Sequence, residues 1–307
     1  MKIAVVGAGA MGSLFGGLLA DAGEEVTLID VWKEHVDAIN ARGLRITGIS
    51  GDRTVNVMAT TDPGIVGSVD LVIIFVKSYD TAKAARDALP MASDETVFLS
   101  LQNGLGNIDK ISEAAGNHRI IRGVTAQGST LLGPGEIYHA GRGPTVIGEL
   151  DDAQTERVQG ISEAFNHAGI PTEISLNIQG AIWSKVLVNV GINPLTALTG
   201  LRNGELLEHP EIKEVMKKAV EEGLLVARGL GIKMELQNPV EKVYEVAEAT
   251  AANRSSMLQD VERGRRTEID ALNGAIVELG RRIGVDTPVN ETLVAAVKGL
   301  ESVRTGA

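Results

Sequence analysis

The chain has 307 residues, about twice the size of a common domain, so we expect two domains. A net charge of −11 argues against nucleic acid as a partner, because its phosphate backbone would be repelled. The absence of cysteine excludes disulfides, thiolate metal ligands and cysteine nucleophiles, and it fits a reducing compartment. The longest apolar run, 71–76, is far too short to span a bilayer, so we expect a cytoplasmic protein with no membrane partner.

The first half of the chain alternates short β-type runs with helical stretches. We expect strands at Lys2–Val6, Glu25–Ile29, 70–76 and 96–99, and helices at 10–22 and 33–41. The run 71–76 is apolar throughout, which is typical of a central parallel strand buried on both faces. This alternation predicts an α/β fold with a doubly wound parallel sheet.

The pattern changes twice further along the chain. Between 120 and 148, short β-type runs separated by Gly/Pro turns predict an antiparallel extension of the sheet. From about residue 174 the chain is helical nearly throughout, including an amphipathic helix at 211–230. We therefore expect a dinucleotide-binding domain at 1–174 and an all-α domain at 175–307 that carries substrate binding and catalysis.

A glycine-rich motif lies between the first strand and the first helix. It reads G-x-G-x-x-G and comprises Gly7, Ala8, Gly9, Ala10, Met11 and Gly12. The first glycine allows a tight turn, the second lets a pyrophosphate approach the backbone, and the third lets the helix pack closely on the strand. Strand before and helix after favour a Rossmann-like dinucleotide site over a ligand-free turn.

Cofactor choice depends on the end of the second strand. Asp30 follows that strand, where an acidic residue usually binds the ribose hydroxyls of NAD and repels the extra phosphate of NADP. The same residue could instead cap a helix. Lys33 lies just beyond and could still meet a 2′-phosphate. The residues alone favour NADH and leave NADPH open.

Several segments together resemble the ketopantoate reductase (2-dehydropantoate 2-reductase) family. They run from residue 1 to about 300 and are the glycine motif at 7–12, VK at 76–77, LQNG at 101–104, WSK at 183–185, NPLTA at 193–197, NGE at 203–205, SSMLQD at 255–260 and TEID at 267–270. The resemblance implies an NAD(P)H-dependent oxidoreductase that reduces ketopantoate to pantoate, a step of pantothenate and coenzyme A biosynthesis. The family is usually NADPH-linked through a basic residue after the second strand, whereas this chain has Asp30, Val31 and Trp32 there.

The resemblance also assigns roles to single residues. Lys185 resembles the family's catalytic lysine and Glu268 its catalytic glutamate, which also lies beside the cofactor. Asn103 resembles the asparagine beside the nicotinamide ribose, and Lys77 a lysine near both cofactor and substrate. The remaining substrate-binding residues that the resemblance implies are Asn189, Asn193, Asn203 and Ser256.

The chemistry of ketone reduction fits a lysine. Negative charge develops on the ketone oxygen as hydride arrives, and a protonated amine stabilises that charge and then delivers the proton, with a benefit of about 10²–10⁴-fold. On a helix, Lys185, Asn189 and Asn193 would share one face because they are four residues apart. Pro194 disfavours helical geometry at the residue before it, so we expect Asn193 on a broken turn.

Glu268 poses a geometric problem. On a straight helix it would lie about 18 Å from Ser256, too far for both to contact one small acid. Gly264 offers a break, and 267–270 resembles a capping box that starts a new helix. We therefore predict a bend between 263 and 268.

Other chemistries find little support. The five histidines have no metal-ligand spacing, so we expect no metal and place each histidine at the surface. Two alternatives stay open: a related reductase acting on another 2-keto or 3-hydroxy acid, and a non-catalytic protein that senses dinucleotides. The apolar helices after residue 210 also leave a homodimer open.

Overall fold

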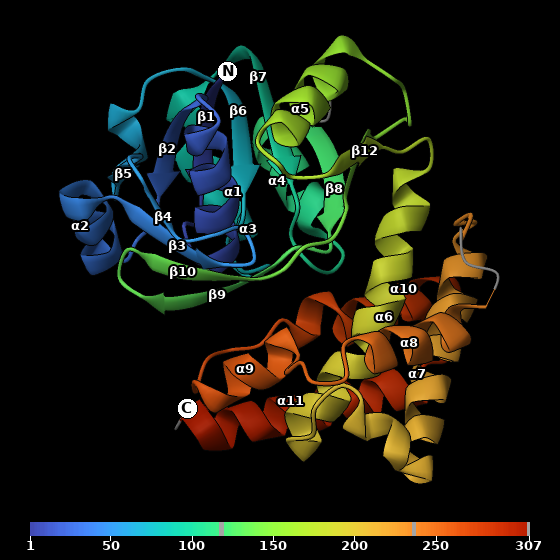
Figure 1. Ribbon diagram of the computed structural model, residues 1–307. Helices are drawn as coiled ribbons and strands as arrows, with labels where there is room; N and C mark the ends of the chain where they lie inside the picture. Colours follow the sequence, from blue (N-terminus) through green and yellow to red (C-terminus); the bar gives the residue numbers. More distant parts are fainter. Residues whose placement is uncertain (117–119, 235–237, 306–307) are drawn as a thin grey trace. The chain divides into compact units, whose positions relative to one another are not determined.

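The computed structural model describes residues 1–116, 120–234 and 238–305 (Figure 1). The chain divides into two compact units, one formed by 1–102 with 107–178 and the other by 103–106 with 179–307. The segment Asn103–Gly106 therefore groups with the helical half of the chain.

A large sheet organises the first unit. Among the described residues it has eight strands in the order β12-β11-β8-β7-β6-β1-β2-β5. The parallel pairs β1–β2, β1–β6, β6–β7, β7–β8 and β2–β5 form the doubly wound part. Its strands are β1 (Lys2–Val6), β2 (Glu25–Ile29), β5 (Met58–Thr60), β6 (Val69–Ile74), β7 (Ala92–Ser100), β8 (Ile120–Thr125), β11 (Thr145–Glu149) and β12 (Thr172–Ile174).

The central strands are buried on both faces, as their composition predicts. Along β1, Ile3 and Val5 join the core on one face of the sheet, whereas Ala4 and Val6 join the core on the other. The first core also contains side chains of α1, α2 and α5, and the second contains side chains of α3 and α4. These helices are α1 (Ala10–Asp21), α2 (Lys33–Arg42), α3 (Thr81–Ala88), α4 (Asn107–Ala115) and α5 (Glu156–His167).

The predicted antiparallel extension is confirmed only in part. β11 pairs antiparallel with β8 in the large sheet, as expected. The strands between them, β9 (Gly128–Gly133) and β10 (Glu136–Gly141), instead form a second sheet with β3 (Leu44–Gly48) and β4 (Arg53–Val55), in the order β4-β3-β10-β9. This small sheet packs on α1, where a Cβ on Gly17 would lie 2.8 Å from side-chain carbons of Leu44 and Ile46 (Figure 1). The extension was misplaced because β3 and β10 pair in parallel across some ninety residues, which local pattern does not reveal.

Helices make up the second unit. They are α6 (Ile178–Thr199, whose first residue belongs to the first unit), α7 (Pro210–Gly229), α8 (Pro239–Ala249), α9 (Ser256–Glu262), α10 (Asn273–Ile283) and α11 (Pro288–Thr305). Short 3₁₀ turns lie at Pro63–Ile65, Leu89–Met91, Glu205–Glu208 and Ile269–Ala271. No helix in the described part of the chain is both long and apolar enough to cross a bilayer.

The expectation that every histidine lies at the surface is wrong for two of them. His35 and His139 are at most 1% exposed. His35 Nδ1 accepts a hydrogen bond from Gly135 N at 3.0 Å, and its Nε2 lies 3.2 Å from Ser13 Oγ. The ring thus links α1 to the turn between β9 and β10. His118 lies outside the described residues.

Candidate functional site

Packing requires two of the three motif glycines. Gly7 has a φ of +94°, and a Cβ on it would lie 2.6 Å from the backbone nitrogen of Val76. A Cβ on Gly12 would lie 2.0 Å from the Gly7 carbonyl oxygen, so any side chain there would push α1 away from β1. A Cβ on Gly9 would meet no described atom within 4 Å. The space above Gly9, the N-cap of α1, is thus open for a phosphate to approach the helix N-terminus.

The motif lies at the carboxyl ends of three neighbouring strands. The backbone nitrogens of Gly7 and Ala8 donate to the Ile29 carbonyl at 2.8 and 3.1 Å, and Phe75 N donates to the Val6 carbonyl at 2.8 Å. The chain leaves β1 towards β2 on one side and β6 lies on the other, so the strand order reverses here. Ligands of open α/β sheets bind at such switch points.

Asp30 is held at the end of β2 by two hydrogen bonds. Its Oδ1 accepts a hydrogen bond from Trp32 N at 2.9 Å, and its own backbone nitrogen donates to the Thr60 carbonyl at 3.2 Å. Val31, where a basic residue would serve a 2′-phosphate, is 90% exposed. Lys33 Nζ forms an ion pair with Asp37 on the next turn of α2, at 2.6 Å.

Lys77 follows β6, and a buried glutamine fixes the strand end before it. The Gln102 side-chain amide donates to the Val76 carbonyl at 2.7 Å and to Thr81 Oγ1 at 2.8 Å. Its Oε1 accepts from Ser100 Oγ at 3.0 Å. Gln102 belongs to the LQNG segment, but its role could not be predicted from the sequence, because only tertiary structure brings residue 102 beside residue 76.

Helix α6 carries Lys185, Asn189 and Asn193, and it continues past Pro194 to Thr199. The broken turn expected at Asn193 is therefore wrong. A proline at 194 cannot donate to the carbonyl of residue 190, but Asn273 Nδ2 donates to that carbonyl at 3.2 Å. Asn273 is fully buried, and its Nδ2 also lies 2.9 Å from Asn290 Oδ1. An amide from α10 thus replaces the hydrogen bond that proline removes, and the three polar residues keep one helical face.

Lys185 has a strongly shifted pKa. Burial lowers the pKa of its ammonium group to about 8, and the Glu268 carboxylate acts in the opposite direction by favouring the charged form. Glu268 is itself only 8% exposed. The structure therefore brings the two predicted catalytic residues into electrostatic contact. A lysine with a pKa near 8 donates a proton more readily than an ordinary lysine at neutral pH.

The predicted bend before Glu268 is confirmed. Helix α9 ends at Glu262, Gly264 has a φ of +61°, and Glu268 precedes the 3₁₀ turn Ile269–Ala271. The predicted capping box is wrong, however. Thr267 Oγ1 does accept from Ile269 N at 3.2 Å, but Thr267 N donates to Glu301 at 2.6 Å, and Asp270 forms ion pairs with Arg266 and Lys298.

The start of α9 is connected to α6 by a chain of hydrogen bonds. Leu258 N donates to Ser255 Oγ, the N-cap of α9, at 3.1 Å. Ser255 Oγ lies 2.6 Å from Thr196 Oγ1, which donates to the Asn193 carbonyl at 2.9 Å. Ser256 is the exposed first residue of α9. The roles of Ser255 and Thr196 were not predicted from the sequence, although serine before an apolar helical run is a recognisable N-cap signal.

Two further predicted residues occupy loops of the second unit. Asn203 Nδ2 donates to Thr250 Oγ1 at 2.9 Å, and its buried Oδ1 has no hydrogen-bond partner among the described residues. Asn103 begins the segment that packs on the turn after Glu268, where Leu105 N donates to the Ala271 carbonyl at 2.8 Å. Gly104, with a φ of +84°, has no room for a Cβ against Ala271. This contact places Asn103 close in space to the Glu268 segment.

Comparisons with known proteins agree along the whole chain. Residues 3–152 match the family model "Ketopantoate reductase PanE/ApbA", and residues 177–301 match its C-terminal counterpart. The 2-dehydropantoate 2-reductase of Pyrococcus horikoshii is 43% identical over 100% of this chain and 99% of its own, and that of Halobacterium salinarum is 42% identical over 97% and 98%.

Solved structures share this fold over nearly the whole chain. A PanE/ApbA family ketopantoate reductase from Ralstonia eutropha JMP134 has a TM-score of 0.93, 38% identity and 99% coverage of both chains. A D-mandelate dehydrogenase in complex with NADH and anilino(oxo)acetate has a TM-score of 0.92, 30% identity and the same coverage. With this architecture and these matches in both halves, the chain belongs to the ketopantoate reductase family.

Proposed function

We propose that this chain reduces 2-dehydropantoate to pantoate with a nicotinamide dinucleotide. The observation that carries the proposal is Lys185, a lysine whose pKa burial lowers to about 8 beside a buried carboxylate. The names of the relatives support the substrate. A non-catalytic dinucleotide sensor would have no use for a proton donor tuned in this way.

The glycine-rich loop of the first unit binds the pyrophosphate, which occupies the open space above Gly9. The dinucleotide, when bound, supplies the hydride. Lys185 gives its proton to the ketone oxygen, and Glu268 keeps that ammonium charged until the transfer. Asn103 holds the nicotinamide ribose.

Substrate binding falls to polar groups on several elements. Asn189 and Asn193 line the face of α6 that carries the lysine, and Ser256 offers a hydroxyl at the start of α9. The unpaired Oδ1 of Asn203 can accept a hydrogen bond from a substrate hydroxyl. Lys77 supplies a positive charge for the carboxylate.

Glu268→Gln is expected to shift the pH dependence of the reaction. Reduction needs protonated Lys185, so kcat/KM should fall as pH rises through about 8. Because the Glu268 carboxylate raises the lysine pKa, its removal should move this alkaline limb to lower pH. The pH profile of kcat/KM measures this, with the exposed Glu278→Gln as control. If the alkaline limb of E268Q stays at the wild-type pH, Glu268 does not act on the pKa of Lys185.

Asp30→Ser is expected to change cofactor preference. We propose NADH as the better cofactor, since Asp30 repels a 2′-phosphate and Lys33 is occupied by Asp37. Removing the carboxylate should raise the NADPH/NADH ratio of kcat/KM about tenfold, equivalent to about 1.4 kcal/mol. Lys33→Ala is the companion variant and should leave the ratio unchanged. A wild type that prefers NADPH and loses this preference in K33A would contradict the assignment.

A second candidate is reduction of a bulkier 2-keto acid, because the D-mandelate dehydrogenase shares fold and length with this chain. Loss of nicotinamide absorbance with 2-dehydropantoate and with phenylglyoxylate, each with NADH and NADPH, decides between them. A kcat/KM at least tenfold higher for 2-dehydropantoate supports the proposal, and the reverse order supports the second candidate.

We further propose that the protein acts in the cytoplasm and as a homodimer, in which exposed apolar side chains such as Leu225 of α7 would be covered.

A further inference from the structure

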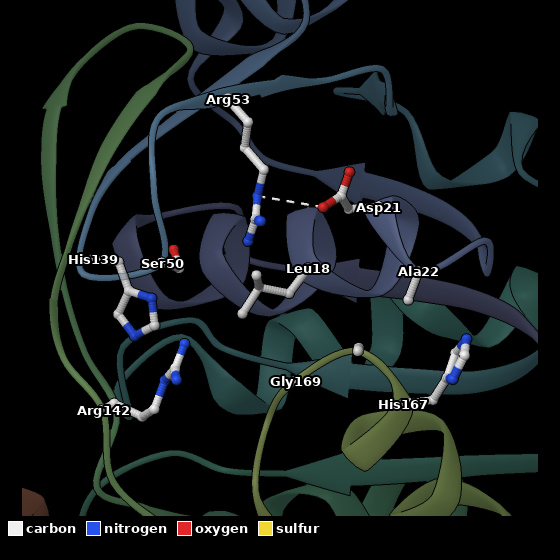
Figure 2. Close-up of a pocket in the computed structure, with 10 residues that line it drawn as sticks. Leu18, Asp21, Ala22, Ser50, Arg53, His139, Arg142, His167 and Gly169 are labelled. Carbon is white, nitrogen blue, oxygen red and sulfur yellow. Dashed lines mark ion pairs between the residues drawn. The ribbon is translucent and has the colours of Figure 1, made fainter.

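A pocket of about 320 Å³ lies in the first unit, away from the glycine-rich loop. It is bordered by the C-terminal part of α1, the loop before β4, the end of β10 and the residues that follow α5 (Figure 2). Leu18, the lining residue of α1 nearest to the motif, comes nine residues after Gly9, so about 14 Å of helix separates the pocket from the motif. One pyrophosphate cannot occupy both places. The volume is in the range of sites for small organic ligands.

Basic side chains gather in this pocket, although the chain as a whole carries a net charge of −11. Arg53, Arg142, His139 and His167 line it, with Asp21 as its acidic residue. Asp21 Oδ2 lies 3.3 Å from Arg53 Nε and offsets one of the two arginine charges. Arg142 is exposed and forms no ion pair within the described part of the chain. Figure 2 shows its guanidinium beside the His139 ring, while Arg53 extends towards Leu18 and Asp21.

Two polar atoms of the pocket are buried without a hydrogen-bond partner among the described residues. They are Ser50 Oγ and His139 Nδ1, whereas Arg53 Nε already lies in the ion pair with Asp21. A buried polar atom without a partner costs free energy, about 1–3 kcal/mol in proteins. Two of them around one pocket of this size indicate a ligand that would supply the missing hydrogen bonds.

The hydrogen bonds of His139 define what its free nitrogen needs. The ring is 1% exposed, and Nε2 lies 2.9 Å from Gln127 Oε1 and 3.2 Å from the Gly141 carbonyl. Both neighbours are acceptors, so Nε2 carries the proton. Burial lowers the pKa of the ring, and Arg142 and Arg53 lower it further, so the ring is neutral. Nδ1 therefore presents a lone pair that requires a donor.

We propose that this pocket binds the phosphate group of a small phosphomonoester at a site separate from the dinucleotide. The anionic oxygens accept from the guanidinium groups of Arg53 and Arg142 and from Ser50 Oγ. The complex holds one proton between the phosphate and Nδ1 of His139. A phosphomonoester, whose second pKa is about 6, brings this proton as its monoanion or takes it up from solvent on binding. Sulfate has the shape of phosphate but takes up no proton near neutral pH, so it can bind the arginines but leaves Nδ1 of His139 without a donor.

The test is a calorimetric titration of the protein saturated with NADH, which fills the glycine-rich loop and carries no phosphomonoester of its own. Glycerol 3-phosphate should bind with saturation, more tightly than inorganic phosphate, and phosphate more tightly than sulfate. Arg142→Gln should weaken binding of glycerol 3-phosphate at least about tenfold, since charge-assisted hydrogen bonds to phosphate are strong. The control is Arg86→Gln, an exposed arginine on α3 of the same unit, and it should bind as wild type does.

His139→Gln keeps a donor near the Nε2 position and removes Nδ1, so it should abolish the preference for phosphate over sulfate. His139 is buried, so this variant can fail to fold. In that case the binding of glycerol 3-phosphate by R142Q, which changes an exposed residue, decides the test. Equal binding by R142Q and wild type, or sulfate binding as tightly as phosphate, would overturn the proposal. Inorganic phosphate binding more tightly than glycerol 3-phosphate would exclude a phosphomonoester.

Discussion

Replacing Lys185 with alanine is expected to lower kcat for ketone reduction by about 10²–10⁴-fold, the usual contribution of a general acid. Burial lowers the lysine pKa to about 8, which means that the protein disfavours the charged form on folding. The variant should therefore remain folded and should not lose stability through the missing charge. Activity and stability should change independently.

The measurement is single-turnover oxidation of the nicotinamide with 2-dehydropantoate, together with the melting temperature and the Kd of the dinucleotide. Lys185→Met keeps most of the side-chain volume and should be equally inactive, so a cavity would not explain the loss. Lys217→Ala on α7, an exposed lysine paired with Glu221, is the control and should keep wild-type activity. A K185A enzyme within about tenfold of wild type would falsify the proposed proton donor.

Gly9→Ala is expected to weaken dinucleotide binding, whereas Gly12→Ala is expected to destabilise the fold. Gly9 has φ −63° and ψ −162°, which alanine can adopt, and its Cβ meets nothing within 4 Å. The G9A protein should melt like wild type but bind the dinucleotide at least about tenfold more weakly, or about 1.4 kcal/mol, since the new methyl occupies the phosphate position. Gly12→Ala places a Cβ 2.0 Å from the Gly7 carbonyl oxygen and should cost about 1–3 kcal/mol or more of unfolding free energy.

Denaturant unfolding and dinucleotide titration on both variants separate the two effects. Gly160→Ala on α5 is a suitable control, because a Cβ there also meets no described atom within 4 Å. Dinucleotide binding by G9A with unchanged affinity would mean that the pyrophosphate does not approach the backbone at this residue.

Much of the first unit was predictable because its signals are local. The glycine motif, the apolar runs of β1 and β6 and the first helices all lie within short windows, and the structure reproduces them within a few residues. The small sheet was not predictable, since it depends on strands β3 and β10 meeting from distant parts of the chain. The pocket beside it rests on the same long-range pairing.

In the candidate site, too, the local features were predictable and those that depend on long-range contacts were not. Helical spacing alone predicted that Lys185, Asn189 and Asn193 share a face. The lowered pKa of Lys185 could not be predicted, because it depends on how tertiary packing removes water from the amine. The unbroken helix at Pro194 also depends on a residue far along the chain, so the local rule for proline gave the wrong answer there.

The amide that completes α6 has a consequence for the order of events during synthesis. Asn273 follows Val190 by 83 residues, and a ribosome adds about 5–20 residues per second. The carbonyl of Val190 thus waits about 4–17 seconds for its donor after it leaves the peptidyl-transferase centre, longer once the exit tunnel is counted. A nascent chain stalled before residue 273 would carry the complete glycine-rich loop, yet the helix that bears Lys185 would still lack one of its hydrogen bonds.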